Sequence, residues 1–449
     1  MNQFLIFLAC QTARRTCYNE DDEKRPREDE NMLRLLMIAD DFTGALDTGV
    51  QLARHGARTL VVTDAGADLR GIGTDVEVLV MDAETRHLPS LQAHEIVARI
   101  VAQGVERNIP YIYKKTDSAL RGNIGAELSA ALEASGVRQL FFFPALPGMN
   151  RQTVDGVHYI DGVPVAQSVF GADPFEPVTE SRVTELIAQQ SDVPAHSFPP
   201  LETAGPLPSQ EGILIFDAQT EMQLRTAGQR LLDAGRLKVM AGCAGFAAVL
   251  PDLLKLGDGH PPALPLLDKR LLVLCGSVNP ITLAQLDAAE RAGFTHLRMT
   301  AEQKLEPNYW DTEPGRLQLE EWTRIMAAGG HCILDSNGVD GSAATDAYAA
   351  RHGWSCCDIR TRVSRSLGRV LKKLGEVEGT LLITGGDTLL QCMHQIGVTE
   401  LQPLGELASG VVLSRFVLDG SPRFVISKSG GFGPPDLLLH LTDFLAAQR

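Results

Sequence analysis

The chain of 449 residues is too long for one hydrophobic core and suits two domains. Its formal net charge of −15 argues against a nucleic-acid partner, which would favour a basic face. No apolar run approaches the ~20 residues that a membrane span requires, so we expect no association with a membrane.

The N-terminal segment 1–31 is expected to be a disordered extension with no part in the fold. Residues 20–30 are almost wholly charged, a composition that cannot bury a core. The apolar run Phe4–Ala9 is too short for the core of a signal peptide, and no positive charge precedes it.

The eight cysteines contain no CxxC pair and no spacing typical of a disulfide framework. The adjacent Cys356 and Cys357 are poorly placed to chelate one metal ion. We therefore expect reduced thiols and a cytoplasmic location.

Short apolar segments alternate with amphipathic ones over residues 32–255, which predicts a parallel sheet covered by helices. The predicted strands are Leu33–Ala39, Val76–Met81, Tyr111–Tyr113, Gln139–Phe143, Ile213–Phe216 and Lys238–Met240. The predicted helices are Ala45–Arg54, Ser90–Val101 and Gly125–Ala134.

A segment rich in glycine and proline, 256–267, predicts a linker, and the alternation restarts over 268–449. The predicted strands there are Leu271–Cys275, Cys332–Leu334 and Thr380–Ile383, and the predicted helices are Thr282–Ala292, Leu317–Ala328 and Thr388–Ile396. The predicted fold class is therefore α/β. It has two domains, each a mainly parallel sheet with helices on both faces, and a ligand cleft between them.

The first candidate site follows the strand that ends at Ala39. Asp40 and Asp41 precede a turn at Gly44 and a helix, and ligands of open α/β sheets bind outside the carboxyl ends of the strands. Adjacent side chains of an extended backbone point to opposite sides, so at most one aspartate should face the ligand. The alternative is that both only cap the helix.

The second candidate follows the strand 111–113 and combines three cations with one carboxylate. Its polar residues are Lys114, Lys115, Thr116, Asp117, Ser118 and Arg121. Cations suit an anionic substrate, whereas the carboxylate and hydroxyls suit its hydroxyl groups. Arg86 adds a cation after the strand that ends at Met81. A solvated charged loop would explain the same residues.

A third segment, Phe143–Thr153, is rich in proline and glycine and also follows a strand. Its Arg151 could hold an anion, but the segment could equally be a rigid structural loop.

In the second half, Gly385, Gly386, Asp387 and Thr388 link a strand to a helix. Paired glycines let backbone N–H groups approach a phosphate at a helix start, and Asp387 could hold a ribose hydroxyl or Mg²⁺. The strand-end Ser277 and the glycine loop at 428–433 could join the same nucleotide. A GxxxxGK[ST] loop and a GxGxxG fingerprint are both absent, so neither a P-loop kinase nor a Rossmann dehydrogenase is favoured.

Together these segments resemble the four-carbon acid sugar kinase family, in particular the D-threonate and D-erythronate kinases. Asp-Asp-Phe-Thr-Gly at 40–44, Lys-Lys-Thr-Asp-Ser at 114–118, Gly-Gly-Asp-Thr at 385–388 and Lys-Ser-Gly-Gly at 428–431 occur in the family's order. The resemblance covers the chain from Met32 onward. It implies an N-terminal acid-sugar-binding domain, a C-terminal nucleotide-binding domain and phosphorylation of a terminal hydroxyl by ATP.

The resemblance also assigns residues. The implied substrate contacts are Asp41, Arg86, Lys114, Lys115, Thr116 and Asp117, and the implied nucleotide contacts are Ser277, Gly385, Gly386, Asp387, Thr388 and Gly430. The run Asp47–Ala53 is more similar to the threonate and erythronate kinases than to the oxo-tetronate branch.

The mechanistic hypothesis is phosphoryl transfer by positioning and charge neutralisation. Arg86 and Lys114 would hold the sugar carboxylate, and Asp41 or Asp117 would orient the attacking hydroxyl. Mg²⁺ would bridge the ATP phosphates with Asp387 as its protein partner.

Three alternatives remain at this point: an oxo-tetronate kinase, an aldolase or isomerase acting on the same acids, and a non-catalytic regulator that binds sugar acid or nucleotide. The oligomeric state stays open, a homo-oligomer included.

Overall fold

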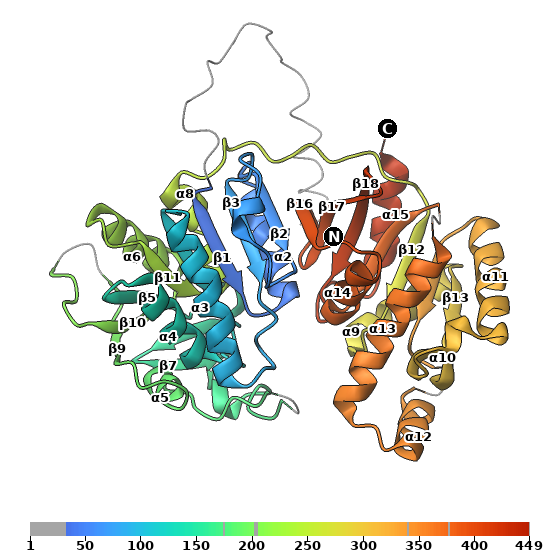
Figure 1. Cartoon of the computed structure of the whole chain (residues 1–449), viewed down its shortest axis with the longest axis horizontal. Coiled ribbons are helices and arrows are strands. Elements are labelled where there is room, and N and C mark those ends of the chain that lie inside the picture. Colours follow the sequence, from blue (N-terminus) through green and yellow to red (C-terminus); the bar gives the residue numbers. More distant parts are fainter. Residues whose placement is uncertain (1–32, 174–175, 202–204, 339–340, 376–377, 449) are drawn as a thin grey trace, which may run out of the picture.

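The structure, a computed structural model, describes residues 33–173, 176–201, 205–338, 341–375 and 378–448. The predicted extension 1–31 lies outside the described residues. Figure 1 shows the N-terminal domain in blue to green and the C-terminal domain in yellow to red, side by side. The α/β class and the two-domain architecture are confirmed.

The N-terminal domain contains one large parallel sheet and one small antiparallel sheet. Its strands are β1 (Leu35–Ala39), β2 (Thr59–Val62), β3 (Val78–Asp82), β4 (Tyr111–Lys115), β5 (Gln139–Phe143), β6 (Arg151–Val154), β7 (Val157–Ile160), β8 (Val163–Pro164), β9 (Ala195–Phe198), β10 (Gly212–Phe216) and β11 (Val239–Gly242). The large sheet has the order β2-β3-β1-β4-β11-β5-β10-β9, and β6–β8 form the small sheet.

Helices cover both faces of the large sheet. They are α2 (Phe42–Ala53), α3 (Ser90–Glu106), α4 (Ile124–Ser135), α5 (Val183–Ala188), α6 (Glu221–Asp233), α7 (Ala244–Ala247) and α8 (Leu250–Leu254). Successive strand residues point to opposite faces. Accordingly, Leu35 and Met37 pack in one hydrophobic cluster with residues of α2, α6 and α7, while Leu36 and Ile38 pack in another with residues of α3 and α4.

The C-terminal domain repeats this plan and ends it with an antiparallel meander. Its strands are β12 (Leu271–Cys275), β13 (Thr295–Arg298), β14 (Cys332–Asp335), β15 (Thr380–Thr384), β16 (Glu400–Ala408), β17 (Val411–Leu418) and β18 (Ser421–Lys428). Its helices are α9 (Pro280–Arg291), α10 (Ala301–Leu305), α11 (Glu313–Ala327), α12 (Ala343–His352), α13 (Cys356–Leu374), α14 (Gly386–Gln395) and α15 (Leu437–Ala447). The order is β13-β14-β12-β15-β18-β17-β16. The first five strands of this order are parallel to one another, and β17 and β16 are each antiparallel to their neighbours.

The predicted elements all fall on observed ones, and Gln139–Phe143 and Leu271–Cys275 coincide with β5 and β12. The elements without a sequence prediction are the small sheet β6–β8, the strands β2, β9 and β13, the meander β16–β18 and the helices α5, α6, α7, α8, α10, α12, α13 and α15. Among the described residues, no helix has the length and apolarity to cross a membrane.

The two sheets join edge to edge, which the sequence did not predict. β16 pairs with β2 in antiparallel register at Glu400↔Val62 and Leu401↔Val61. One hydrophobic cluster, which includes Val61, Leu389 and Leu401, therefore crosses the junction. Between α8 and β12 the chain forms neither helix nor strand, and the linker boundaries 256–267 stay a prediction.

Candidate active site

The guanidinium of Arg86 draws together the carboxyl ends of β1 and β4. Its Nε donates to Asp40 Oδ2 at 2.7 Å, and its Nη2 lies 2.7 Å from Asp41 Oδ1. The same Nη2 lies 3.8 Å from Asp117 Oδ1. Three carboxylates from two different segments thus converge on one largely buried cation.

Asp40 and Asp41 have different environments, as alternation along an extended backbone requires. Asp40 is buried against Arg86. Although burial raises the pKa of Asp40, the charges of Arg86, Lys114 and Lys115 hold it below its usual range. Asp41 keeps 25% of its side chain exposed and caps α2, because its Oδ1 accepts from Gly44 N at 3.1 Å.

Lys114 lies beneath this cluster with no exposed surface. Its Nζ lies 2.8 Å from Glu127 Oε2 on α4 and donates to the carbonyl of Lys115 at 2.7 Å. Direct contact with a substrate would therefore require this ion pair to separate. The role of Lys114 as a substrate contact stays a prediction.

Lys115 and Thr116 have unused hydrogen-bonding capacity at the end of β4. Lys115 Nζ is buried and donates to the carbonyl of Thr116 at 2.9 Å, and in the described part of the chain no carboxylate lies within 4.0 Å of it. A Cβ at Gly44 would lie 2.9 Å from this Nζ, so the ammonium sits at the N-terminus of α2. Thr116 Oγ1 is buried with no hydrogen-bond partner among the described residues. This environment suits an anionic, hydroxylated ligand.

Both carboxylate oxygens of Asp117 accept hydrogen bonds. Oδ1 and Oδ2 accept from Arg121 Nη2 and Nε at 2.9 and 3.0 Å, and Oδ2 also accepts from Ala119 N at 3.1 Å. Burial raises the pKa of Asp117, but Arg86 and Arg121 lower it well below its usual range. Asp117 is therefore ionised and is a weak proton acceptor.

Arg151, the candidate anion ligand of the third segment, opens β6 and donates to Ser118 Oγ. Its guanidinium also lies 5.2 Å from the ring centroid of Phe170.

The predicted nucleotide residues meet at the carboxyl ends of three adjacent strands, β12, β15 and β18. Gly385 N donates to the carbonyl of Lys428 at 3.3 Å. A Cβ at Gly430 would lie 2.9 Å from Ser277 Oγ, and one at Gly276 would lie 1.9 Å from Thr388 Oγ1. The fold thus brings Ser277, the 385–388 turn and Gly430 together, with backbone close enough to exclude larger residues.

Asp387 points to the helix α13 and pairs with Arg360, with Oδ1 3.0 Å from Arg360 Nη2. Within the described ranges, no group of three or more His, Cys, Asp or Glu residues is arranged to hold a metal ion. A single carboxylate still fits Mg²⁺ chemistry, because Mg²⁺ in kinase sites is held by one or two carboxylates plus substrate phosphates.

Lys428 adds a buried cation to the glycine loops, a role that the sequence analysis did not assign although the residue lies in the 428–431 motif. Its Nζ donates to Thr282 Oγ1 at 3.1 Å and to the carbonyls of Ser429 and Gly430 at 3.0 and 3.3 Å. All these partners are neutral, and burial lowers the pKa of Lys428 to about 8. An anion beside the ammonium would stabilise its charge.

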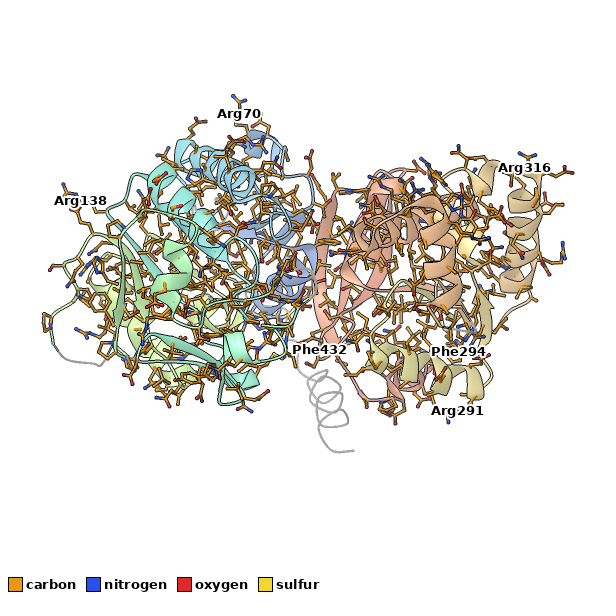
Figure 2. The ribbon with its side chains drawn as sticks, turned by 90° about the horizontal axis from the view of Figure 1, so that it is seen from below. Arg70, Arg138, Arg291, Phe294, Arg316 and Phe432 are labelled. Atoms are coloured by element: carbon orange, nitrogen blue, oxygen red, sulfur yellow. The ribbon has the colours of Figure 1, made fainter. Side chains whose placement is uncertain are left out.

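The two halves of the site touch where α2 and α14 begin. A Cβ at Gly386 would lie 2.2 Å from Thr43 Oγ1. Between these helix starts lies a cavity of about 10 Å³, lined by residues that include Thr43, Asp47, Lys428 and Ser429. Such a volume holds about one water molecule. Figure 2 places Phe432, which follows the Gly430 loop, near the junction of the two domains.

Two further carboxyl groups at this junction were missed by sequence reasoning. Burial and the nearby Asp41 raise the pKa of Asp47 and of Glu84 to about 7 each. Asp47 Oδ2 accepts from Ser429 Oγ at 3.4 Å, and Glu84 Oε1 accepts from Phe42 N at 3.1 Å. Glu84 has a φ of 47°, unusual for a residue with a side chain. Nothing in the local sequence pattern signals either environment.

Comparison with known proteins gives matches along both domains. Residues 35–250 match the family described as a sugar-binding N-terminal domain, and residues 272–438 match a nucleotide-binding C-terminal domain. The chain is 31% identical to a Salmonella typhimurium D-threonate kinase over 90% of this chain and 97% of that protein.

More distant relatives carry related names. A Heliobacterium modesticaldum D-erythronate kinase is 27% identical (92% of this chain, 97% of the relative), and a Brucella melitensis 3-oxo-tetronate kinase is 26% identical (89% and 93%). A solved protein from Salmonella typhimurium shares the fold, with a TM-score of 0.74 at 21% identity, covering 93% of this chain and 99% of that one.

Asp117→Asn should destabilise the protein by about 3 kcal/mol at pH 7, because it leaves two arginines without their shared buried carboxylate. Since the folded-state pKa of Asp117 is depressed, its stabilisation is present above the unfolded pKa and lost as pH falls. The difference in unfolding free energy from wild type should therefore be constant between about pH 6 and 8 and shrink below about pH 4. Urea unfolding at several pH values measures it.

Asp68→Asn is the matched control, because Asp68 pairs with Arg70 at 2.9 Å on the surface. It should leave stability nearly unchanged at every pH. An Asp117→Asn protein as stable as this control would contradict the assignment of Asp117 as a buried electrostatic anchor.

Proposed function

The chain belongs to the four-carbon acid sugar kinase family and is an ATP-dependent carbohydrate-acid kinase. From this we propose which acid it phosphorylates, and at which hydroxyl. It transfers the terminal phosphoryl group of ATP to the 4-hydroxyl of D-threonate or D-erythronate. The observation that carries this proposal is the contact between the starts of α2 and α14. This contact places Asp41 and Lys115, which both lie at the start of α2, next to the 385–388 glycine turn. The family assignment favours this reading over an aldolase, an isomerase or a non-catalytic regulator.

The choice of acid rests on relatedness. Three relatives named D-threonate kinase are 31%, 28% and 28% identical, against 27% for the D-erythronate kinase and 26% for the 3-oxo-tetronate kinase. The alternative is a 3-oxo- or 2-oxo-tetronate kinase of the same family. A cytoplasmic location and a homo-oligomeric state also stay predictions.

On the sugar side, Arg86 and Lys115 hold the substrate carboxylate, with Lys114 behind them, and Thr116 meets a substrate hydroxyl. Asp41 orients the attacking hydroxyl, because it is the most exposed carboxylate of the Arg86 cluster. Asp117 serves as the second catalytic carboxylate through its charge. Its lowered pKa makes it a poor base, and its side chain is only 9% exposed, against 25% for Asp41.

On the nucleotide side, the N–H groups of the first turn of α14, which starts at Gly386, approach the phosphates. Gly385 lets the backbone come close, and Lys428 supplies a cation from the neighbouring strand end. Ser277, Thr388 and Gly430 complete the pocket. Mg²⁺, held by Asp387, would neutralise charge on the ATP phosphates.

Entry of ATP requires α2 and α14 to separate, since about 10 Å³ cannot hold a triphosphate. Closure around both substrates would then exclude water from the transfer and suppress hydrolysis of ATP.

The test of the proposed function is ADP release with Mg-ATP against D- and L-threonate, D- and L-erythronate and the oxo-tetronates, followed by a coupled assay. We expect turnover with D-threonate or D-erythronate and little with the others. Turnover confined to an oxo-tetronate would move the protein to the other branch. If no acid of the panel gave ADP release although ATP binding was shown separately, the proposed substrate class would be overturned.

Asp41→Asn should lower kcat by at least about 100-fold, because a neutral amide cannot orient or accept the hydroxyl proton as the carboxylate does. Asparagine retains a cap for α2, so the fold and ATP binding should be unchanged. Steady-state kinetics and nucleotide titration measure both effects.

Asp64→Asn is the control, because this exposed aspartate likewise accepts from a nearby backbone N–H, that of Gly66 at 2.8 Å. It should keep wild-type kinetics. Retention of wild-type kcat in the Asp41→Asn protein would remove Asp41 from the catalytic set.

Asp387→Asn should raise the Mg²⁺ concentration for half-maximal activity about tenfold, since the site loses its carboxylate ligand. Arg360→Gln breaks the same ion pair from the other side and leaves the carboxylate in place. It should keep the wild-type Mg²⁺ dependence. Equal dependence on Mg²⁺ in both variants would show that Asp387 matters only for the ion pair.

A further inference from the structure

A second cavity lies away from the junction, between the end of α10 and one face of α13. Its volume is about 220 Å³, well above the 10–15 Å³ or so that one water molecule requires. The charged side chains that line it are Lys304, Arg362, Arg365, Arg369, Glu306 and Asp358. Four cations and two carboxylates give an excess of positive charge in a chain whose net charge is −15.

The two carboxylates offset these cations only in part, because both are engaged with hydrogen-bond donors outside the cation set. Glu306 Oε1 accepts from the hydroxyl of Tyr348 at 3.0 Å. Asp358 accepts from Ser355 N and Oγ at 2.8 and 2.6 Å, as part of the capping box that starts α13. Neither forms an ion pair with a lining cation within the described residues.

Two of the arginines have donors to spare. Arg369 Nη1 is buried with no hydrogen-bond partner among the described residues, an arrangement that native proteins seldom leave unfilled. Arg365 forms neither a hydrogen bond nor an ion pair within the part of the chain that the structure describes.

The other two cations are fixed in place by neutral groups. Lys304 is buried and donates from Nζ to the carbonyl of Ser336 at 2.7 Å. Arg362 donates to the carbonyl of Leu305 at 3.0 Å and lies 3.6 Å from the ring centroid of Trp354. Lys304 and Arg362 are therefore fixed in place, whereas Arg365 is exposed to solvent. The lining carries an excess of positive charge, which carboxylates outside it, Asp335 and Asp346 near Lys304 and Asp311 near Arg369, offset only in part.

This cavity is separate from the nucleotide loops. Arg362, Arg365 and Arg369 recur at helical spacing and so share one face of α13. Arg360, two residues before Arg362, points to the other side of the helix and pairs with Asp387. A ligand in the cavity would lie across α13 from the predicted ATP site.

We propose that the cavity between α10 and α13 binds a small polyanion with two or more oxyanion charges, a phosphate ester or a polycarboxylate. Planar guanidinium groups bind such anions in bidentate pairs, and Arg365 and Arg369 offer unused donors at adjacent turns of one helix. The proposal is independent of which acid the kinase phosphorylates.

The test is calorimetric titration of the full chain with pyrophosphate and, separately, with tricarballylate at constant ionic strength. We expect at least one probe to bind, and Arg365→Gln to weaken that binding about tenfold through loss of a charge-assisted contact. Arg365→Lys, which keeps the charge but loses the fork, should fall between the two. The preferred probe indicates whether the natural ligand is a phosphate ester or a polycarboxylate.

Arg324→Gln is the matched control, an exposed arginine on α11 in the same domain that does not line the cavity. It should bind both probes as wild type does. Equal affinity in the Arg365→Gln and Arg324→Gln proteins would place any bound anion elsewhere and overturn the proposal. Failure of both probes to bind wild type would overturn it as well.

Discussion

The guanidinium of Arg86 holds Asp40, Asp41 and Asp117 within 4 Å, and the rest of the sugar side is arranged around that contact. Without it, the buried Asp40 would lose its paired cation, and breaking such a buried pair costs about 3–5 kcal/mol, whereas Asp117 would keep Arg121. Because Asp41 also caps α2, the same guanidinium fixes the point where that helix begins. The position of the start of α2 in turn determines which residues contact the start of α14 across the junction.

The junction combines two opposite electrostatic demands. The starts of α2 and α14 and the ammonium groups of Lys115 and Lys428 favour an anion there. Asp47 and Glu84 would oppose one, but burial raises the pKa of both carboxyls to about 7, so each is largely neutral below that pH. Below about pH 7 these acidic side chains can thus lie beside the proposed anion site with little repulsion.

The sequence was informative where function depends on a strand end followed by polar residues, because that pattern is local. It therefore predicted Asp41, Lys115 and the 385–388 turn as site residues. The fold places them on the two sides of one junction, and their roles stay predictions. It could not predict that Lys114 would form an ion pair with Glu127, because Glu127 lies on the separate helix α4. Helix α13 was missed because it is strongly basic, and its buried face is largely made of small residues such as Ser364 and Gly368. The edge pairing of β2 with β16 depends on tertiary contact alone.

The proposed entry of ATP at the junction requires a movement of the two domains, and the topology restricts where its hinges can lie. The backbone connections between the domains are the segment between α8 and β12, which has no helix or strand, and the two residue pairs of β2 with β16. Side chains also join them, through the shared hydrophobic cluster and the ion pair of Arg54 with Glu406. A hinge needs only a few residues that absorb dihedral change, and these connections supply them. Separation would expose Asp47 and Glu84 to water and return their pKa values toward the usual range near 4. The closed form, which raises both pKa values, must therefore lose stability relative to the open form as pH rises from about 4 to about 7. Above that range both groups are ionised in both forms and their contribution no longer changes, so bound substrates have to supply the remaining free energy of closure.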